Sequence, residues 1–313
     1  MSLITGSTCM RNGVSGMCVS IYDCLSSYLD FIDKDLAPIC SFRDKEPIIC
    51  CTDCTFNDTR YKKRQSNRYF FYIFVKHFFH QALLGYGFDV STADWLCGGT
   101  VISERFILTA GHCLSSPSRG LVKYITLGIL KRTDPPELWQ IYNVKRRIPH
   151  PEYMPPSKYH DIALLETDTE ITFSAAVLPA CLHASGEAEK KLFALGWGAL
   201  GYRRELADIL QEVTKYEKDE CSQYYPSHRH LKTGYNHTTQ MCFGDKEVLR
   251  DTCEGDSGGP LQDFRNKYFE KLYCIKTVVG VTSSGKQCGI AHSPGIYTRV
   301  IYYVPWIESI VWP

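Results

Sequence analysis

Short apolar runs separated by turn residues dominate the chain from about residue 81 onward. Typical runs are Thr100–Ile102, Arg105–Thr109, Ile162–Leu165 and Thr277–Val281, and Gly, Pro, Asp and Asn recur between them. Many short strands at this spacing favour an all-β sandwich or barrel.

The C-terminal residues follow a helical period instead. Pro305 suits the first turn of a helix. Ile307, Ile310 and Val311 then recur at i, i+3 and i+4 on one face. We therefore expect a short helix that begins at Pro305 and packs on the β body.

Residues 1–54 differ from the rest in cysteine content. Of the 15 cysteines, seven lie in this segment, and six of those stand at positions 9, 18, 24, 40, 50 and 51. So short a segment cannot bury enough apolar area to be stable alone, which predicts a disulfide-stapled domain. Spacing alone leaves the connectivity open. A zinc module is disfavoured because residues 9–51 contain neither His nor a Cys-x-x-Cys pair.

Residues 55–80 are predicted to be a linker between this domain and a second domain at 81–313. The linker begins polar and basic, and Lys62–Arg64 is expected to be open to proteases. An aromatic run follows at Tyr69–Phe79. It is too short for a membrane helix and is interrupted by Lys76 and His77.

Charge and composition narrow the function classes. The 313 residues are 44% apolar, enough for a sizeable core, and 35 basic against 34 acidic residues leave a net charge of +1. This balance removes the simplest argument for a nucleic-acid or membrane-surface binder. No uninterrupted apolar segment reaches the roughly 20 residues of a membrane span.

The cysteine density predicts an oxidising compartment, and so a secreted, extracellular protein. Acceptor sequons for glycosylation at Asn57 and Asn236 agree with secretion. Residues 1–8 have no basic region and no apolar core, so no signal peptide is predicted there.

Three local sequences carry candidate chemistry: Thr109–Cys113 with His112, Asp161–Leu165, and Gly255–Pro260 with Ser257. A serine hydroxyl needs a base to take its proton and a buried carboxylate to orient that base. Taken singly, His112 and Asp161 are more often structural residues, whereas the Gly-Asp-Ser-Gly-Gly pentamer is specific. Together, in the order His, Asp, Ser, they indicate a catalytic triad of the chymotrypsin arrangement.

With these motifs, the chain resembles chymotrypsin-fold (S1) serine proteases with an N-terminal clip domain, as found in arthropod extracellular cascades. The resemblance covers residues 9–54 and 81–313. Further matching segments are Leu178–Cys181, Gly196–Gly198, Gly280–Gly285, Pro294–Arg299 and Val304–Ile307. The family implies two six-stranded antiparallel β-barrels with the active site between them.

The resemblance also implies an oxyanion hole and a specificity pocket. The backbone N–H groups of Gly255 and Ser257 would bind the developing oxyanion. Asp251, six residues before the nucleophile, would lie at the base of the pocket and pair with a substrate Arg or Lys. Gly285 and Gly295 would form open pocket walls. The chain departs from the family at Ser284, where an aromatic residue is usual, and peptide binding is expected to be weaker for it.

Family disulfides can be carried over to 14 of the cysteines. The implied pairs are Cys9–Cys50, Cys18–Cys40, Cys24–Cys51, Cys54–Cys181, Cys97–Cys113, Cys221–Cys242 and Cys253–Cys288. Cys274 is left over, which suggests an intermolecular bond, a free thiol or a lost partner. The family reaction needs no metal or cofactor, and we predict neither; His228 and His230 are interpreted as part of a surface loop.

The activation segment departs most from the family. Family zymogens are cleaved to free an Ile-Val-Gly-Gly terminus whose ammonium pairs with the acid before the nucleophile, here Asp256. No such sequence occurs near the expected position, Asn67–Phe70. Either residues 65–79 contain a sequence error such as translated intron, or the protein is a homologue that cannot be activated in this way. The intact triad and pocket favour the first hypothesis.

The sequence therefore predicts a secreted zymogen that cleaves after Arg or Lys in an immune, melanisation or developmental cascade. Expected partners are a downstream zymogen or cytokine precursor, an activating protease and a serpin-type inhibitor, with neither nucleic acid nor a membrane span. The alternative is a non-activatable protease homologue that acts as a binding cofactor.

Overall fold

The computed structural model divides the chain into two units, residues 1–65 and 66–313. It describes residues 8–11, 14–20, 39–43, 46–51, 80–174, 176–201, 204–217, 221–244, 253–263, 276–285 and 294–313. The predictions for Cys24, Cys54, Asn57, Asp251, Cys274, Cys288 and the activation segment at 65–79 lie outside these residues.

The N-terminal unit contains a four-stranded antiparallel sheet in the order β1-β2-β4-β3. Its strands are β1 (Thr8–Arg11), β2 (Val14–Ser20), β3 (Ile39–Arg43) and β4 (Glu46–Cys51). Cys18 is buried and disulfide-bonded, and its register partner on β4 is Cys50. A half-cystine thus stands opposite a second cysteine position on the neighbouring strand, in a sheet too small to hold a large core.

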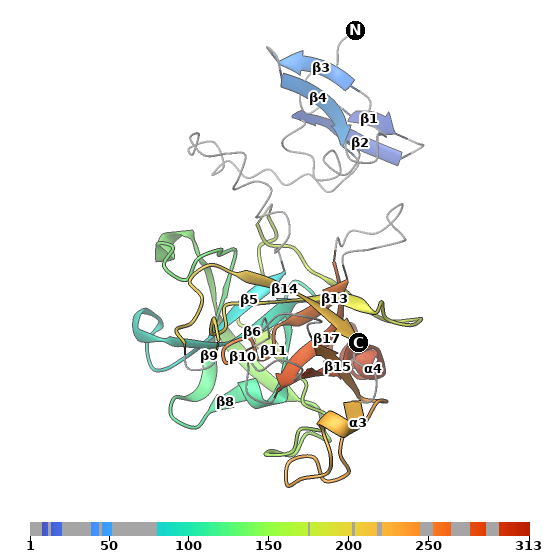
Figure 1. Ribbon diagram of the computed structural model, residues 1–313. Coiled ribbons are helices and arrows are strands. Elements are labelled where there is room, and N and C mark those ends of the chain that lie inside the picture. The colour runs from blue at the N-terminus through green and yellow to red at the C-terminus, as the bar shows by residue number, and fades with distance from the viewer. Residues whose placement is uncertain are drawn as a thin grey trace. The chain divides into compact units, whose positions relative to one another are not determined.

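The first barrel of the second unit has the strand order β10-β11-β7-β6-β5-β9 and closes where β10 pairs with β9. Figure 1 labels β5, β6, β9, β10 and β11 of this barrel. Its strands are β5 (Gln81–Tyr86), β6 (Asp94–Val101), β7 (Phe106–Thr109), β9 (Gly120–Leu127), β10 (Gln140–Pro149) and β11 (Ala163–Thr167). The short β8 (Ser115–Ser116) pairs antiparallel with the start of β9. Turns of 3₁₀ helix occur at η3 (Val90–Thr92), η4 (Gly111–Leu114) and η5 (Pro136–Leu138).

The second barrel closes where β17 pairs with β18, after the order β17-β16-β13-β14-β15-β18. Its strands are β13 (Lys191–Gly196), β14 (Gln211–Glu217), β15 (Gln240–Gly244), β16 (Pro260–Asp263), β17 (Thr277–Ser284) and β18 (Gly295–Arg299). The two-residue β12 (Cys181–Leu182) pairs parallel to β17, and α3 (Cys221–Tyr224) is one helical turn. The expected fold of two six-stranded antiparallel barrels is confirmed.

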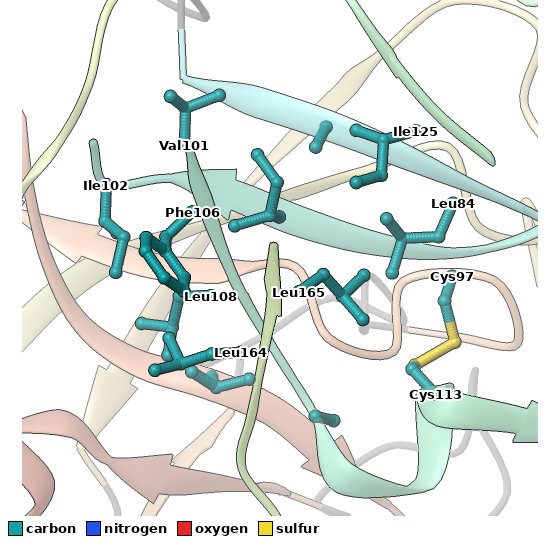
Figure 2. Packing of buried hydrophobic residues seen from close by; sticks show 14 of the residues in the cluster. Leu84, Cys97, Val101, Ile102, Phe106, Leu108, Cys113, Ile125, Leu164 and Leu165 are labelled. Carbon is teal, nitrogen blue, oxygen red and sulfur yellow. A yellow bond between two sulfur atoms is a disulfide. The ribbon is translucent and has the colours of Figure 1, made fainter. Parts of the chain in front are cut away.

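Alternating apolar side chains of the first barrel interdigitate in one core. Figure 2 shows Leu84, Val101, Phe106, Leu108 and Leu165 within it, with the Cys97–Cys113 disulfide at one end. Full burial of one such side chain stabilises the fold by about 1.5–3 kcal/mol. The disulfide closes a loop of 16 residues, which adds about 3 kcal/mol by restricting the unfolded chain.

The C-terminal helix α4 spans Val300–Val311, so the expected start at Pro305 is wrong. Helix packing explains the earlier start, because Val300, Tyr303 and Val304 are buried in the first barrel's core. Pro305 is on the exposed side of the helix, where its missing N–H and its ring are better tolerated. Among the described residues, no helix is both long and apolar enough to cross a membrane.

Candidate active site

Antiparallel pairing of β7 with β11 brings His112 and Asp161 together. Thr109 at the end of β7 stands opposite Ala163 at the start of β11. His112 lies in η4, the short 3₁₀ turn that follows β7, and Asp161 lies two residues before the start of β11. Nδ1 of His112 lies 2.8 Å from Oδ2 of Asp161, and the His112 backbone N–H donates to Oδ1 at 2.9 Å.

Asp161 is fully buried and accepts hydrogen bonds from both barrels. The Ser283 hydroxyl on β17 donates to Oδ2 at 2.5 Å, and the Thr298 hydroxyl on β18 donates to the Asp161 carbonyl at 2.8 Å. Burial by itself raises the pKa of Asp161, but His112 and the hydrogen bonds from His112 and Ser283 hold that pKa below its usual value. The carboxylate therefore stays ionised beside the imidazole.

Ser257 lies in a turn of the second barrel between two glycines with left-handed backbone. Gly255 has φ +101° and Gly258 has φ +78°. The Ser257 carbonyl accepts from the Gly98 N–H at 2.7 Å, and Gly98 follows Cys97, which is disulfide-bonded to Cys113 beside His112. These links bring Ser257 to the corner that holds His112, although no hydrogen bond joins the two side chains in this structure.

Asp256 anchors the turn that carries Ser257. Its Oδ1 accepts from the Gly198 N–H at 2.7 Å, and its Oδ2 accepts from the Cys253 N–H at 2.8 Å. A Cβ at Gly196 would lie 2.0 Å from Asp256 Oδ1, and one at Gly198 would lie 2.4 Å from the Asp256 carboxyl carbon. The carboxylate therefore requires both glycines of the Gly-Trp-Gly segment.

Gly285 and Gly295, the two residues predicted to form the walls of the specificity pocket, are both among the described residues. Gly285 follows β17, Gly295 begins β18, and a Cβ built on Gly285 would meet only the Gly295 Cα, at 4.0 Å. Beside them is a cavity of about 400 Å³. It is lined by Lys158, Tyr224, Tyr225, Pro226, His228, His230, Leu231, Ser284 and Gly285.

The structure contains the disulfides Cys97–Cys113 and Cys221–Cys242, two of the pairs that the resemblance implied. Cys181 and Cys253 are also disulfide-bonded. The predicted pairs Cys9–Cys50, Cys18–Cys40, Cys24–Cys51, Cys54–Cys181 and Cys253–Cys288 stay predictions.

Two groups of potential metal ligands occur among the described residues. Cys97, His112 and Cys113 form one, but both sulfurs are already in a disulfide. His150, Glu152 and His160 form the other. The sequence reasoning missed this second group, and it also missed Ser283 and Thr298 as partners of Asp161.

Residues 80–307, which include both barrels and these side chains, match the family model for trypsin. The chain belongs to the trypsin family of serine proteases. Within that family it is 31% identical to serine protease snk of Drosophila melanogaster over 97% of this chain and 78% of that protein.

Other relatives of the trypsin family extend the comparison. CLIP domain-containing serine protease C9 of Anopheles gambiae is 31% identical over 95% of this chain and 83% of its own length. Melanization protease 1 of Drosophila melanogaster is 35% identical over 69% of this chain and 58% of its own length. The expected similarity to clip-domain serine proteases is confirmed.

Proposed function

We propose that this chain is a secreted serine endopeptidase, made as a zymogen, that cleaves peptide bonds after Arg or Lys. The observation that carries the proposal is the buried, ionised Asp161 in contact with Nδ1 of His112, at the corner where the Ser257 turn docks. Membership of the trypsin family supports the same chemistry.

We assign a role to each group from this geometry and from the family mechanism. Because the ionised Asp161 accepts at Nδ1 of His112, that nitrogen carries the hydrogen and Nε2 keeps a lone pair. Nε2 takes the proton of Ser257 as its Oγ attacks the scissile carbonyl, and later gives it to the leaving amine. The N–H groups of Gly255 and Ser257 stabilise the oxyanion, where one such donor contributes about 3 kcal/mol.

Specificity for a basic side chain rests on Asp251 at the pocket base and on the glycine walls Gly285 and Gly295. A long Arg or Lys enters between glycines without steric conflict and pairs with the carboxylate. Ser284 opens the neighbouring cavity, whose aromatic lining includes Tyr224 and Tyr225. We expect this cavity to receive substrate side chains that precede the cleaved bond.

The biological setting is proposed from the same family. Disulfides support secretion into an oxidising compartment. The residues up to 54 form a clip domain, 55–80 a linker and 81–313 the protease domain. Protein partners are a downstream zymogen or cytokine precursor, an activating protease and a serpin-type inhibitor. Asn57 and Asn236 are glycosylated; Asn236 is partly buried, and its side-chain oxygen accepts from the Thr238 N–H.

The second candidate function is a non-catalytic homologue that binds cascade partners. Its specific support is the sequence before residue 80, which lacks Ile-Val-Gly-Gly. In family members the ammonium of that terminus pairs with the acid before the nucleophile, here Asp256, and this pairing orders the oxyanion hole.

The test is hydrolysis of an Arg-linked chromogenic peptide by the full chain after limited trypsin treatment and removal of trypsin. Ser257→Ala is the control for residual trypsin. A repaired chain carries Ser66→Arg and Ile-Val-Gly-Gly at positions 67–70, so that trypsin cleavage frees the family terminus. Activity that is retained with a Lys-linked peptide and lost with a Leu-linked peptide is the result expected of the proposed pocket.

Activity in the repaired chain, abolished by Ser257→Ala, supports the enzyme proposal. Activity in the natural chain as well means that Asp256 uses a different partner. Activity in the repaired chain alone means that the catalytic machinery is sound and the natural sequence is blocked at activation. If neither chain hydrolyses the peptide although both are folded, the enzyme proposal is overturned and the proposal of a non-catalytic binding homologue is supported.

A further inference from the structure

Two imidazoles and a carboxylate meet where β10 passes into the loop before β11. His150 and Glu152 follow the end of β10, and His160 directly precedes Asp161. The His150 N–H donates to the Ile162 carbonyl at 3.0 Å, so the pairing of the two strands continues into this corner. The rings of His150 and His160 stack with centroids 5.4 Å apart and planes 13° apart.

We propose that His150, Glu152 and His160 form a binding site for a zinc-type divalent metal ion. One nitrogen or oxygen atom of each side chain lies within 4.8 Å of the other two. Two imidazole nitrogens and a carboxylate oxygen are a donor set that suits Zn²⁺, with water in the fourth position of a tetrahedron.

The spacing of the donors fits an ion better than a direct contact. Nδ1 of His160 lies 3.8 Å from Oε2 of Glu152, too far for a hydrogen bond. Two ligands of a tetrahedral zinc ion are about 3.4 Å apart, given bonds of about 2.0–2.1 Å. The Glu152 side chain is 66% exposed, so it can close the small remaining gap without disturbing the core.

Side chains of helix α4 contact both imidazoles. The His150 ring meets the rings of Tyr303 and Trp306 edge-to-face at 5.0 Å each. These ring contacts fix the orientation of His150 before an ion arrives. The Tyr303 hydroxyl lies 3.1 Å from Nδ1 of His160, the nitrogen that faces Glu152, and an ion bound to this nitrogen would displace that contact.

The site is coupled to the proposed catalytic residues through the chain itself. His160 has φ +52°, the left-handed region that non-glycine residues rarely adopt, and its neighbour is Asp161. An ion held between His160 and Glu152 pulls on the His160 backbone, which continues into Asp161. Displacements of about 1 Å in catalytic groups cost roughly 10²-fold in rate, so zinc is expected to lower kcat. This consequence rests on the proposed function, whereas metal binding does not.

The binding test is calorimetric titration of the full chain with Zn²⁺. The parent is expected to bind one ion here, and Glu152→Gln and His150→Gln each to weaken that binding at least tenfold. The matched control replaces another histidine pair, His228→Gln with His230→Gln, and is expected to bind as the parent does. Zinc held elsewhere, for example by a free thiol, is common to all variants and cancels in the comparison.

Glu152→Gln keeps the test informative should His150→Gln unfold, because Glu152 is exposed and the change preserves its size; thermal unfolding checks both. A parent that binds no zinc, or a loss of binding in the control with retention in Glu152→Gln, overturns the proposal.

The activity test uses the active form of the chain from the peptide assay. Zinc is expected to lower kcat several-fold in the parent and not in Glu152→Gln. Inhibition that is equal in both, with a raised KM, means that zinc acts at His112 instead and overturns the coupling. An inactive chain contradicts the proposed function while leaving the calorimetric result to decide the metal site.

Discussion

His112 and Asp161 of the first barrel stand at the ends of paired strands, whereas Ser257 of the second barrel sits in a turn. Strand register places the first two residues, since β7 and β11 are fixed by a shared apolar core. The turn depends on two left-handed glycines and on the anchors of Asp256. The half of the site that holds His112 and Asp161 is therefore rigid. The shape of the half that holds Ser257 depends on the hydrogen-bond partners of the Asp256 carboxylate.

The largest expected effect comes from Asp161→Asn in the repaired, trypsin-activated chain. The amide keeps the shape of the rigid half but favours the wrong tautomer of His112, so kcat is expected to fall about 10⁴-fold. Peptide hydrolysis measures kcat, and circular dichroism checks that the strands persist. A fall of less than tenfold would contradict the assigned role of Asp161.

Gly258→Ala tests the turn. The new Cβ would lie 2.2 Å from the Thr109 hydroxyl and 2.5 Å from the Gly98 carbonyl, at φ +78°. We expect a loss of about 3 kcal/mol or more in the free energy of unfolding, measured with urea. Gly186→Ala is the matched control, because it has the same φ of +78° but nothing within 4 Å of its Cβ; about 1 kcal/mol is expected. Equal losses would mean that backbone strain, not the contact between barrels, dominates.

His80 gives a pH-dependent effect at a contact between the two barrels. It is buried, and its ring lies 2.6 Å from the Gln262 side-chain oxygen on β16. Burial, with Lys276 nearby, lowers the pKa of His80 to about 4 despite the hydrogen bond to Gln262. The unfolded chain therefore binds the extra proton below about pH 6.5, and stability is lost as the pH falls from there toward 4.

Between pH 7 and pH 5 this loss amounts to about 2 kcal/mol. His80→Gln removes the titrating ring, so its drop in unfolding free energy over that interval should be smaller than the parent's by that amount. Urea unfolding at the two pH values measures both drops. Parallel drops in the two chains would show that His80 does not titrate on unfolding.

The smallest effect is expected from Ser283→Ala. The hydroxyl is the second barrel's contact with the first barrel's carboxylate, and its loss leaves Asp161 with one hydrogen-bond donor fewer. If the lost hydrogen bond contributes about 1–2 kcal/mol to the stabilisation of the transition state, kcat is expected to fall roughly tenfold. An unchanged kcat would mean that the two halves of the site are held independently.

Short-range patterns predicted an all-β body and pointed to the candidate triad, whereas the two six-stranded barrels were implied by the family resemblance. The strands follow from local apolar runs, and Ser257 from a pentamer whose glycines the turn requires. Contacts between residues far apart in the chain could not be predicted from such patterns. Ser283 and Asp161 are 122 residues apart, and the sequence around neither residue indicates that the other is its partner. The start of α4 was misjudged because burial of Val300 and Tyr303 outweighed the local preference of Pro305.

The His150, Glu152 and His160 group was missed for a related reason. The two histidines are separated by an irregular loop that includes Met154 and Ser157, so no helical or strand period relates them. Only the pairing of β10 with β11 brings the ends of that loop together.

The place of α4 has a consequence for biosynthesis. Val300, Tyr303, Val304 and Ile307 complete the core of the first barrel, yet Val300 lies 133 residues after Thr167, the end of that barrel's last strand. At translation rates of about 5–20 residues per second, the barrel waits roughly 7–27 seconds for its final apolar layer. During that interval its apolar wall is open to chaperones, and His112 and Asp161 are held in an unfinished scaffold. Polypeptides interrupted before α4 should therefore be recognised as unfolded and degraded, not released as half-formed proteases.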